Sequence, residues 1–210
     1  MKHITFYLDF VCPYAYLAFE HLPQALEGVS YSVSYQPVLF AEVLEHHGQR
    51  GQTDVASQRD WICRQVPWLA RHLGIQLQMP AHPALHPYDA FKAFNPLPLL
   101  HLALACSGNT DAATGHPNRH ICEAVFRHVW RGGAQAGDTQ QLQALGQQLA
   151  PHLNMHNPAD VARVNLQLKR NTQNAITKGV FSVPSFAVDE QLFCGLDALP
   201  MLRDALNTHA

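Results

Sequence analysis

Residues 9–18 read Asp-Phe-Val-Cys-Pro-Tyr-Ala-Tyr-Leu-Ala. Before this stretch, residues 3–9 alternate apolar and polar side chains, which is the pattern of a strand. Pro13 stands where a helix would begin, a place that proline tolerates because its missing N–H has no helical partner there. The helix is expected to run to about Glu27. Cys12 is therefore predicted at the junction between a strand and its following helix.

This junction has consequences for the Cys12 thiol. A side chain at the start of a helix faces unpaired backbone N–H groups and the positive end of the helix dipole. Both favour an anionic sulfur, so the pKa of Cys12 is expected to lie below the value of about 8.5 for a free cysteine. The alternative is that Cys12 is a small core residue without a chemical role.

Outward from this stretch, the two ends of the chain contain the strands. Residues 29–38 alternate again and predict a second strand, parallel to the first because a crossover helix joins them. Residues 185–188 and 191–194 flank Asp189-Glu190 and predict a hairpin. Asp197 is expected to cap a last helix. The outline is βαβ, a long helical segment, and ββα.

Residues 40–178, between these strands, show helical periodicity and loops. Residues 97–105 are strongly apolar and predict a buried helix. A helix with Ile121, Val125 and Val129 on one face is expected to begin at Pro117. Further helices are expected to begin at the capping residues Asp138 and Asn157.

A second motif lies just before the predicted hairpin. Residues 179–186 read Gly-Val-Phe-Ser-Val-Pro-Ser-Phe, which looks like the cis-proline loop of thioredoxin-fold proteins. In that loop the residue before the proline, here Val183, offers its backbone N–H and C=O to an extended peptide such as glutathione. Pro184 could instead serve only to fix the loop.

Together the motifs resemble those of 2-hydroxychromene-2-carboxylate isomerases and kappa-class glutathione transferases. Residues 9–18 are similar to the family signature Asp-Phe-x-Ser-Pro-Tyr-x-Tyr-Leu-Ala, residues 179–186 to its proline loop, and residues 193–202 to its C-terminal segment. The resemblance implies an α/β fold, a thioredoxin-like βαβ…ββα fold interrupted by an all-helical insertion domain, as in DsbA-like proteins. The thioredoxin-like domain would comprise residues 1–39 and 179–210, and the insertion domain residues 40–178.

The resemblance also implies an enzyme that uses glutathione in aromatic catabolism. The family reaction interconverts 2-hydroxychromene-2-carboxylate and trans-o-hydroxybenzylidenepyruvate. A thiolate adds reversibly to the conjugated enone, which turns a double bond into a rotatable single bond. Cys12 is the expected catalytic residue, and Asp197 is expected to hold the γ-glutamyl amine of glutathione. The expected glutathione-binding residues are Cys12, Pro13, Gln49, Arg50, Val183, Pro184, Leu196 and Asp197.

Some of these residues have plainer interpretations. Asp197 could be only a helix cap, and Gln49 and Arg50 could be solvated loop residues. Trp61, Trp68 and Tyr88 could line a pocket for an aromatic substrate, but aromatic residues at helical spacing are more often core. The cysteines expected to be inert are Cys63, Cys106, Cys122 and Cys194.

Two departures from the family pattern leave the chemistry open. The family's usual serine is Cys12 here, and a thiol is a weaker donor than a hydroxyl but can itself react. A monothiol oxidoreductase linked to glutathione is therefore one alternative, and a glutathione transferase of kappa type or a catalytically silent glutathione-binding protein are others. Ala15 stands where a dithiol oxidoreductase has its second cysteine, so a DsbA-like cycle lacks its resolving thiol.

Composition and charge argue against several other classes of protein. The formal net charge of −2 gives no basic face for nucleic acid, and no apolar run is long enough to cross a membrane. The N-terminus lacks the features of a signal peptide, so a cytoplasmic protein is expected. None of the 14 histidines or five cysteines follows a metal-ligand spacing, and no metal site is expected. By resemblance, the protein is expected to be a homodimer with a small aromatic substrate.

Overall fold

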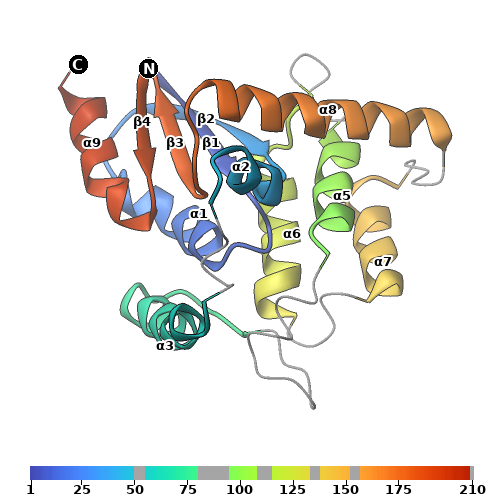
Figure 1. Ribbon diagram of the computed structural model, residues 1–210, viewed down its shortest axis with the longest axis horizontal. Helices are drawn as coiled ribbons and strands as arrows, with labels where there is room; N and C mark the ends of the chain where they lie inside the picture. Colours follow the sequence, from blue (N-terminus) through green and yellow to red (C-terminus); the bar gives the residue numbers. More distant parts are fainter. Residues whose placement is uncertain (50–54, 80–94, 108–114, 133–137, 152–156, 209–210) are drawn as a thin grey trace.

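A computed structural model describes residues 1–49, 55–79, 95–107, 115–132, 138–151 and 157–208 of the chain. Strand β1 (Lys2–Leu8) leads into helix α1 (Pro13–Ala25), and strand β2 (Tyr31–Pro37) follows. Strands β3 (Ser185–Val188) and β4 (Gln191–Cys194) come after the helical segment. The observed order confirms the thioredoxin-like βαβ…ββα pattern with helices inserted between β2 and β3 (Figure 1).

The four strands form one mixed sheet in the order β2-β1-β3-β4. As predicted, β1 pairs with β2 in parallel, from Lys2 beside Tyr31 to Leu8 beside Pro37. Strand β3 pairs antiparallel with β1 and with β4, and the hairpin has the predicted bounds. Two strand ends differ slightly from the prediction. Strand β1 ends at Leu8 instead of Asp9, and β2 begins at Tyr31 instead of Val29.

The inserted helices follow the predicted periodicity. Two of the predicted caps are confirmed, because Asp138 accepts a hydrogen bond from the N–H of Gln140 and Asn157 accepts one from Ala159. The prediction that Pro117 begins a helix is wrong. Asn118 caps that helix through the N–H of Ile121. The bounds are α2 (Phe40–His46), α3 (Ala56–His72), α5 (Leu97–Ser107), α6 (Arg119–Arg131), α7 (Thr139–Leu149) and α8 (Pro158–Thr177).

The inserted helices have distinct positions. In Figure 1, α5, α6 and α7 stand side by side beneath the long helix α8, while α3 lies apart from them, below α1. Helix α5 is buried along nearly its whole length, as its composition predicts. Within the described parts of the chain, no helix combines the length and the apolar content that a membrane span requires.

One hydrophobic cluster runs through the sheet, α1 and the inserted helices. Trp130 of α6 stacks on Tyr16 of α1 with ring centroids 5.9 Å apart, and its indole N–H donates to the backbone carbonyl of Phe10 at 2.9 Å. Phe126, one turn earlier, packs edge-on against the Phe10 ring. The turn that precedes Cys12 is thus fixed by a helix of the insertion. The division into two domains at residues 39/40 and 178/179 stays a prediction.

The C-terminal segment departs from the expected cap. Asp197 lies inside a short 3-10 turn, η2 (Leu196–Ala198), and the last helix, α9 (Leu199–Asn207), begins two residues later with Ala198 at its N-cap. The predicted capping role of Asp197 is therefore wrong. Gly195 has a φ of 99°, and a Cβ at this position would collide with Oδ1 of Asp197. This glycine lets the chain turn sharply from β4 into η2.

Candidate active site

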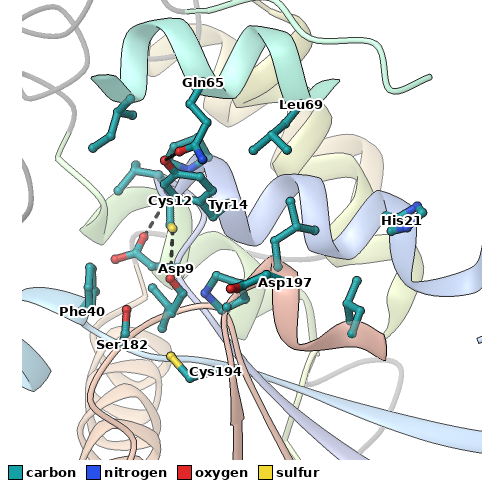
Figure 2. A pocket seen from close by; sticks show the side chains of 18 of the residues that line it. Asp9, Cys12, Tyr14, His21, Phe40, Gln65, Leu69, Ser182, Cys194 and Asp197 are labelled. Atoms are coloured by element: carbon teal, nitrogen blue, oxygen red, sulfur yellow. Dashed lines mark hydrogen bonds between the residues drawn. The ribbon is translucent and has the colours of Figure 1, made fainter. Parts of the chain in front are cut away.

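Cys12 occupies the predicted junction. It is the N-cap residue of α1, with φ −85° and ψ 115°, and Pro13 takes the first helical position. Its N–H donates to the carbonyl of Asp9 at 3.1 Å, and its carbonyl accepts from Tyr16 at 3.1 Å. The side chain is 9 % exposed and points from the start of the helix toward the proline loop (Figure 2).

The proline loop lies directly opposite. The Val183–Pro184 peptide bond is cis, as the motif suggests. The Cys12 thiol donates to the Val183 carbonyl at 3.3 Å, across 171 residues of sequence. The Pro184 carbonyl accepts from the N–H of Gly195 at 2.8 Å, which ties the loop to the turn carrying Asp197. Three segments distant in sequence therefore meet at Cys12.

The predicted ionisation of Cys12 is wrong in this structure. Burial raises the pKa of the Cys12 thiol to about 12, and the backbone N–H groups of Ala15 and Tyr14 lower it only in part. The negative charge of Asp9 raises this pKa further. The helix start acts in the expected direction, but the loss of water around the sulfur is larger. At neutral pH, Cys12 is an uncharged S–H donor.

A cavity of about 1120 Å³ opens in front of Cys12. Pockets for single small ligands are typically about 300–1,000 Å³, so this cavity has room for a tripeptide and a second small molecule. Gln49 is exposed and does not line the cavity, and Arg50 lies outside the described residues. The predicted glutathione-binding residues that the structure brings to this cavity are Cys12, Pro13, Val183, Pro184, Leu196 and Asp197.

Helix α3 forms the opposite wall. The Tyr14 hydroxyl donates to Oε1 of Gln65 at 2.6 Å, which joins the start of α1 to this helix. Burial, followed by the nearby Cys12, raises the pKa of Tyr14 to about 12. Trp61 lines the cavity yet is 54 % exposed, and Trp68 is equally exposed, so the prediction that these rings are core is wrong. Tyr88 lies outside the described residues.

Three polar groups of this cavity, Asp9, Gln65 and Cys194, have no role that the sequence predicts. Asp9 is only 2 % exposed, and burial raises the pKa of its carboxyl to about 6, although the N–H groups of Val11 and Phe40 lower it. Cys194, expected to be inert, also lines the cavity and interacts electrostatically with Cys12. Asp9 could have been noticed, because it lies at the end of the first strand, three residues before Cys12. Gln65 gives no local signal, since its partner is 51 residues away.

Comparison with known proteins extends these observations. Residues 3–207 match the family described as DSBA-like thioredoxin domain. The chain is 24 % identical over 213 residues to a 2-hydroxychromene-2-carboxylate isomerase from Sphingobium xenophagum, with 98 % of each chain covered.

Solved structures agree with the observed fold. A 2-hydroxychromene-2-carboxylate isomerase superposes with a TM-score of 0.73 at 24 % identity, covering 99 % of this chain and 95 % of the other. The cytosolic disulfide reductase DsbM from Pseudomonas aeruginosa, solved with GSH, gives a TM-score of 0.58 at 16 % identity. This second match covers 99 % of this chain and 98 % of the other.

Proposed function

The chain belongs to the family of DSBA-like thioredoxin domains, and from this premise we propose that it is a glutathione-dependent isomerase of the 2-hydroxychromene-2-carboxylate type. The observation that carries the proposal is the convergence of Cys12, Val183 and Asp197 on one cavity. A thiol donor, a backbone clamp and a carboxylate there suit the sulfur, the peptide backbone and the amine of glutathione. Two relatives that match this chain over nearly its whole length are named 2-hydroxychromene-2-carboxylate isomerase, and these names support the same reaction class.

Each of these groups would have a separate task. The backbone of Val183 would bind the peptide of glutathione, as an added strand binds a sheet edge. Asp197 would hold the γ-glutamyl amine through a charge-assisted hydrogen bond. The neutral Cys12 thiol can donate its S–H to an anionic sulfur, as the serine hydroxyl would in the related signature. Gln49 and Arg50 stay predicted contacts.

When bound, glutathione would supply a thiolate that adds reversibly to a conjugated double bond, so that the bond can rotate before elimination. The chain must then hold an aromatic enone acid beside the sulfur in a reactive orientation. Apolar side chains of α3 offer such a surface: Ile62, Leu69 and the exposed ring of Trp61 all line the cavity. We assign the aromatic part of the substrate to this wall.

A monothiol oxidoreductase is the second candidate, favoured by the structural likeness to DsbM. That chemistry requires the Cys12 thiolate as nucleophile. Burial holds the pKa of Cys12 at about 12, which disfavours the thiolate at neutral pH. Ala15 is fully buried and supplies no resolving thiol. The isomerase is therefore the better supported function.

The proposal is tested by two measurements on the purified protein. Millimolar glutathione should raise the melting temperature, because a ligand at a hundredfold excess over Kd stabilises a protein by about 2.7 kcal/mol. Conversion of 2-hydroxychromene-2-carboxylate, followed by absorbance, should require glutathione. A kappa-type transferase would instead release a glutathione conjugate, which mass spectrometry detects. Absence of both binding and isomerisation contradicts the proposal.

A further inference from the structure

Gln65 is a polar residue in the middle of the apolar cavity wall that α3 forms. It comes one turn after Trp61 and one turn before Leu69, on the same face of the helix, and all three side chains line the cavity. Ile62 lines the cavity from this face as well. In small-molecule pockets, a few polar groups placed among apolar side chains fix the orientation of the ligand. The proposed function gives Gln65 no task.

Tyr14 fixes the orientation of the Gln65 amide. The Tyr14 hydroxyl donates to Oε1 of Gln65 at 2.6 Å. Burial raises the pKa of Tyr14 to about 12, so this hydroxyl keeps its proton at neutral pH and acts as the donor. Because Oε1 is engaged, the amide is turned so that Nε2 is its open end. Figure 2 shows Gln65 reaching from α3 toward Tyr14 and Cys12.

The amide nitrogen of Gln65 has donors to offer. A glutamine Nε2 carries two N–H donors, and this one forms no hydrogen bond with any other described residue. It is also not among the buried nitrogens of the described residues that lack a partner, so a molecule in the cavity can reach it. A carboxylate is the acceptor that such donors bind most strongly, because the hydrogen bond is then charge-assisted.

Basic side chains of the cavity lie far from Cys12. Among the described residues that line the cavity, only His21 and Arg203 are basic. Arg203 donates to the carbonyls of Ala25 and Glu27 at the far end of α1, a helix of 13 residues that is therefore about 20 Å long. His21 is also set well apart from Cys12 (Figure 2). A carboxylate held near Cys12 therefore needs an uncharged donor.

We propose that Gln65 determines specificity for an aromatic acid by donating from Nε2 to the carboxylate of the substrate, with Tyr14 as its positioning residue. The inference rests on the proposed function for the class of the substrate. In an enone acid, the carbon that accepts the sulfur lies only a few bonds from the carboxylate, so both must be held near Cys12. The ring then packs on Ile62 and Leu69, which flank Gln65 along α3.

A purely structural role for Gln65 makes a different prediction. If this residue only joins α3 to α1, Gln65→Glu should bind ligands like the unchanged protein, because a carboxylate still accepts from the Tyr14 hydroxyl. This variant keeps the shape of the side chain but has no N–H donors, and its negative charge repels a carboxylate. Gln65→Met removes the donors without adding a charge. Gln148→Glu, on the exposed side of α7, is the matched control for the added charge.

The test is calorimetric titration, without glutathione, of two probes that share a ring system. Chromone-2-carboxylate has the carboxylate and chromone lacks it. The unchanged protein and Gln148→Glu should bind chromone-2-carboxylate more tightly than chromone. Gln65→Glu and Gln65→Met should lose about 10–100-fold in affinity for chromone-2-carboxylate, the effect of one hydrogen bond to a charged group, and stay within about twofold for chromone. Tyr14→Phe should lower the same preference by a smaller factor, because the amide is present but no longer fixed.

Three results would overturn the proposal. These are unchanged affinity of Gln65→Glu for chromone-2-carboxylate, an equal loss of affinity for both probes, and no binding of either probe by the unchanged protein. If Gln65→Glu fails to fold, Gln65→Met decides the matter in the same way, since methionine is a good helix former of similar length.

Binding of these probes requires no turnover, so the outcomes separate the inference from the proposed function. Selective loss of carboxylate binding, in a protein that does not isomerise, supports the role of Gln65 and contradicts the isomerase assignment. Isomerisation with unchanged carboxylate binding by Gln65→Glu supports the isomerase and contradicts the role of Gln65. In an active enzyme, Gln65→Glu should raise KM for 2-hydroxychromene-2-carboxylate about 10–100-fold and leave KM for glutathione within about threefold.

Discussion

Cys12 and Val183, on the wall formed by α1 and the proline loop, are 9 % and 5 % exposed, whereas Trp61 and Trp68 on α3 are each 54 % exposed. The first wall is held by buried hydrogen bonds that join segments distant in sequence. The second wall is joined to the start of α1 by the hydrogen bond between Tyr14 and Gln65. We infer that sulfur chemistry is fixed by the thioredoxin-like part, while the shape offered to a second molecule depends on α3.

The largest difference between the walls should appear in thiol reactivity. Because the pKa of Cys12 is about 12, its thiolate fraction at pH 7 is more than about a thousandfold below that of a free cysteine, and it rises tenfold for each pH unit up to about 12. Iodoacetamide labelling followed by peptide mass spectrometry should find Cys12 far slower than the half-buried Cys63 on α3. Equal or faster labelling of Cys12 at pH 7 would show that the sulfur is not held neutral.

The next largest effect concerns stability, because Trp130 of α6 packs behind the turn that precedes Cys12, whereas Trp68 is exposed on α3. Trp130→Ala removes a fully buried ring and leaves the Phe10 carbonyl without its indole donor, so the free energy of unfolding should fall by about 3–5 kcal/mol. Trp68→Ala should change it by less than about 0.5 kcal/mol, since the ring is exposed and stacks only on His72 among the described rings. Urea titrations measure both values. Comparable losses would contradict the contrast between the buried Trp130 and the exposed Trp68.

A smaller effect is expected at Asp197. If Asp197 binds the amine of glutathione as proposed, Asp197→Asn would remove a charge-assisted hydrogen bond worth about 1.5–3 kcal/mol and weaken glutathione binding about 10–100-fold. Because α9 begins at Leu199 without the Asp197 side chain as cap, thermal stability without glutathione should hardly change. Calorimetry and melting curves test the two statements. A large loss of stability with unchanged binding would reassign Asp197 to the fold.

Most of the helices and strands could be predicted from the sequence, because the patterns that predict them depend on residues close together in the chain. The strand alternation around Ile4 and Phe6, and the caps Asp138 and Asn157, depend only on near neighbours in sequence. The cap assigned to Asp197 failed because Gly195, with φ 99°, turns the chain into a 3-10 segment first. A short turn of this kind leaves no periodic signature.

The site was predicted less completely, because its electrostatics depend on tertiary burial. The helix start before Pro13 is visible in the sequence, but the loss of water that raises the pKa of Cys12 is not. The partial burial of Gln65 and its bond to Tyr14 likewise need the placement of α3, which no motif specifies. The motifs predicted residues that the structure places around one cavity, whereas the ionisation of Cys12 follows from its burial.

The smallest expected change is also the most decisive, because it concerns what Cys12 does. As a neutral hydrogen-bond donor, Cys12 can be replaced by serine, whose hydroxyl is the stronger donor. Cys12→Ala is the matched control, which removes the donor and should lower activity about tenfold, the equivalent of one hydrogen bond.

The measurement is glutathione-dependent isomerisation of 2-hydroxychromene-2-carboxylate by Cys12→Ser beside the unchanged protein, with circular dichroism to confirm the fold. We expect kcat/KM equal to or several-fold above that of the unchanged protein. A correctly folded Cys12→Ser without turnover, from a parent that is active, would mean that Cys12 is the attacking nucleophile and that the assigned chemistry is wrong.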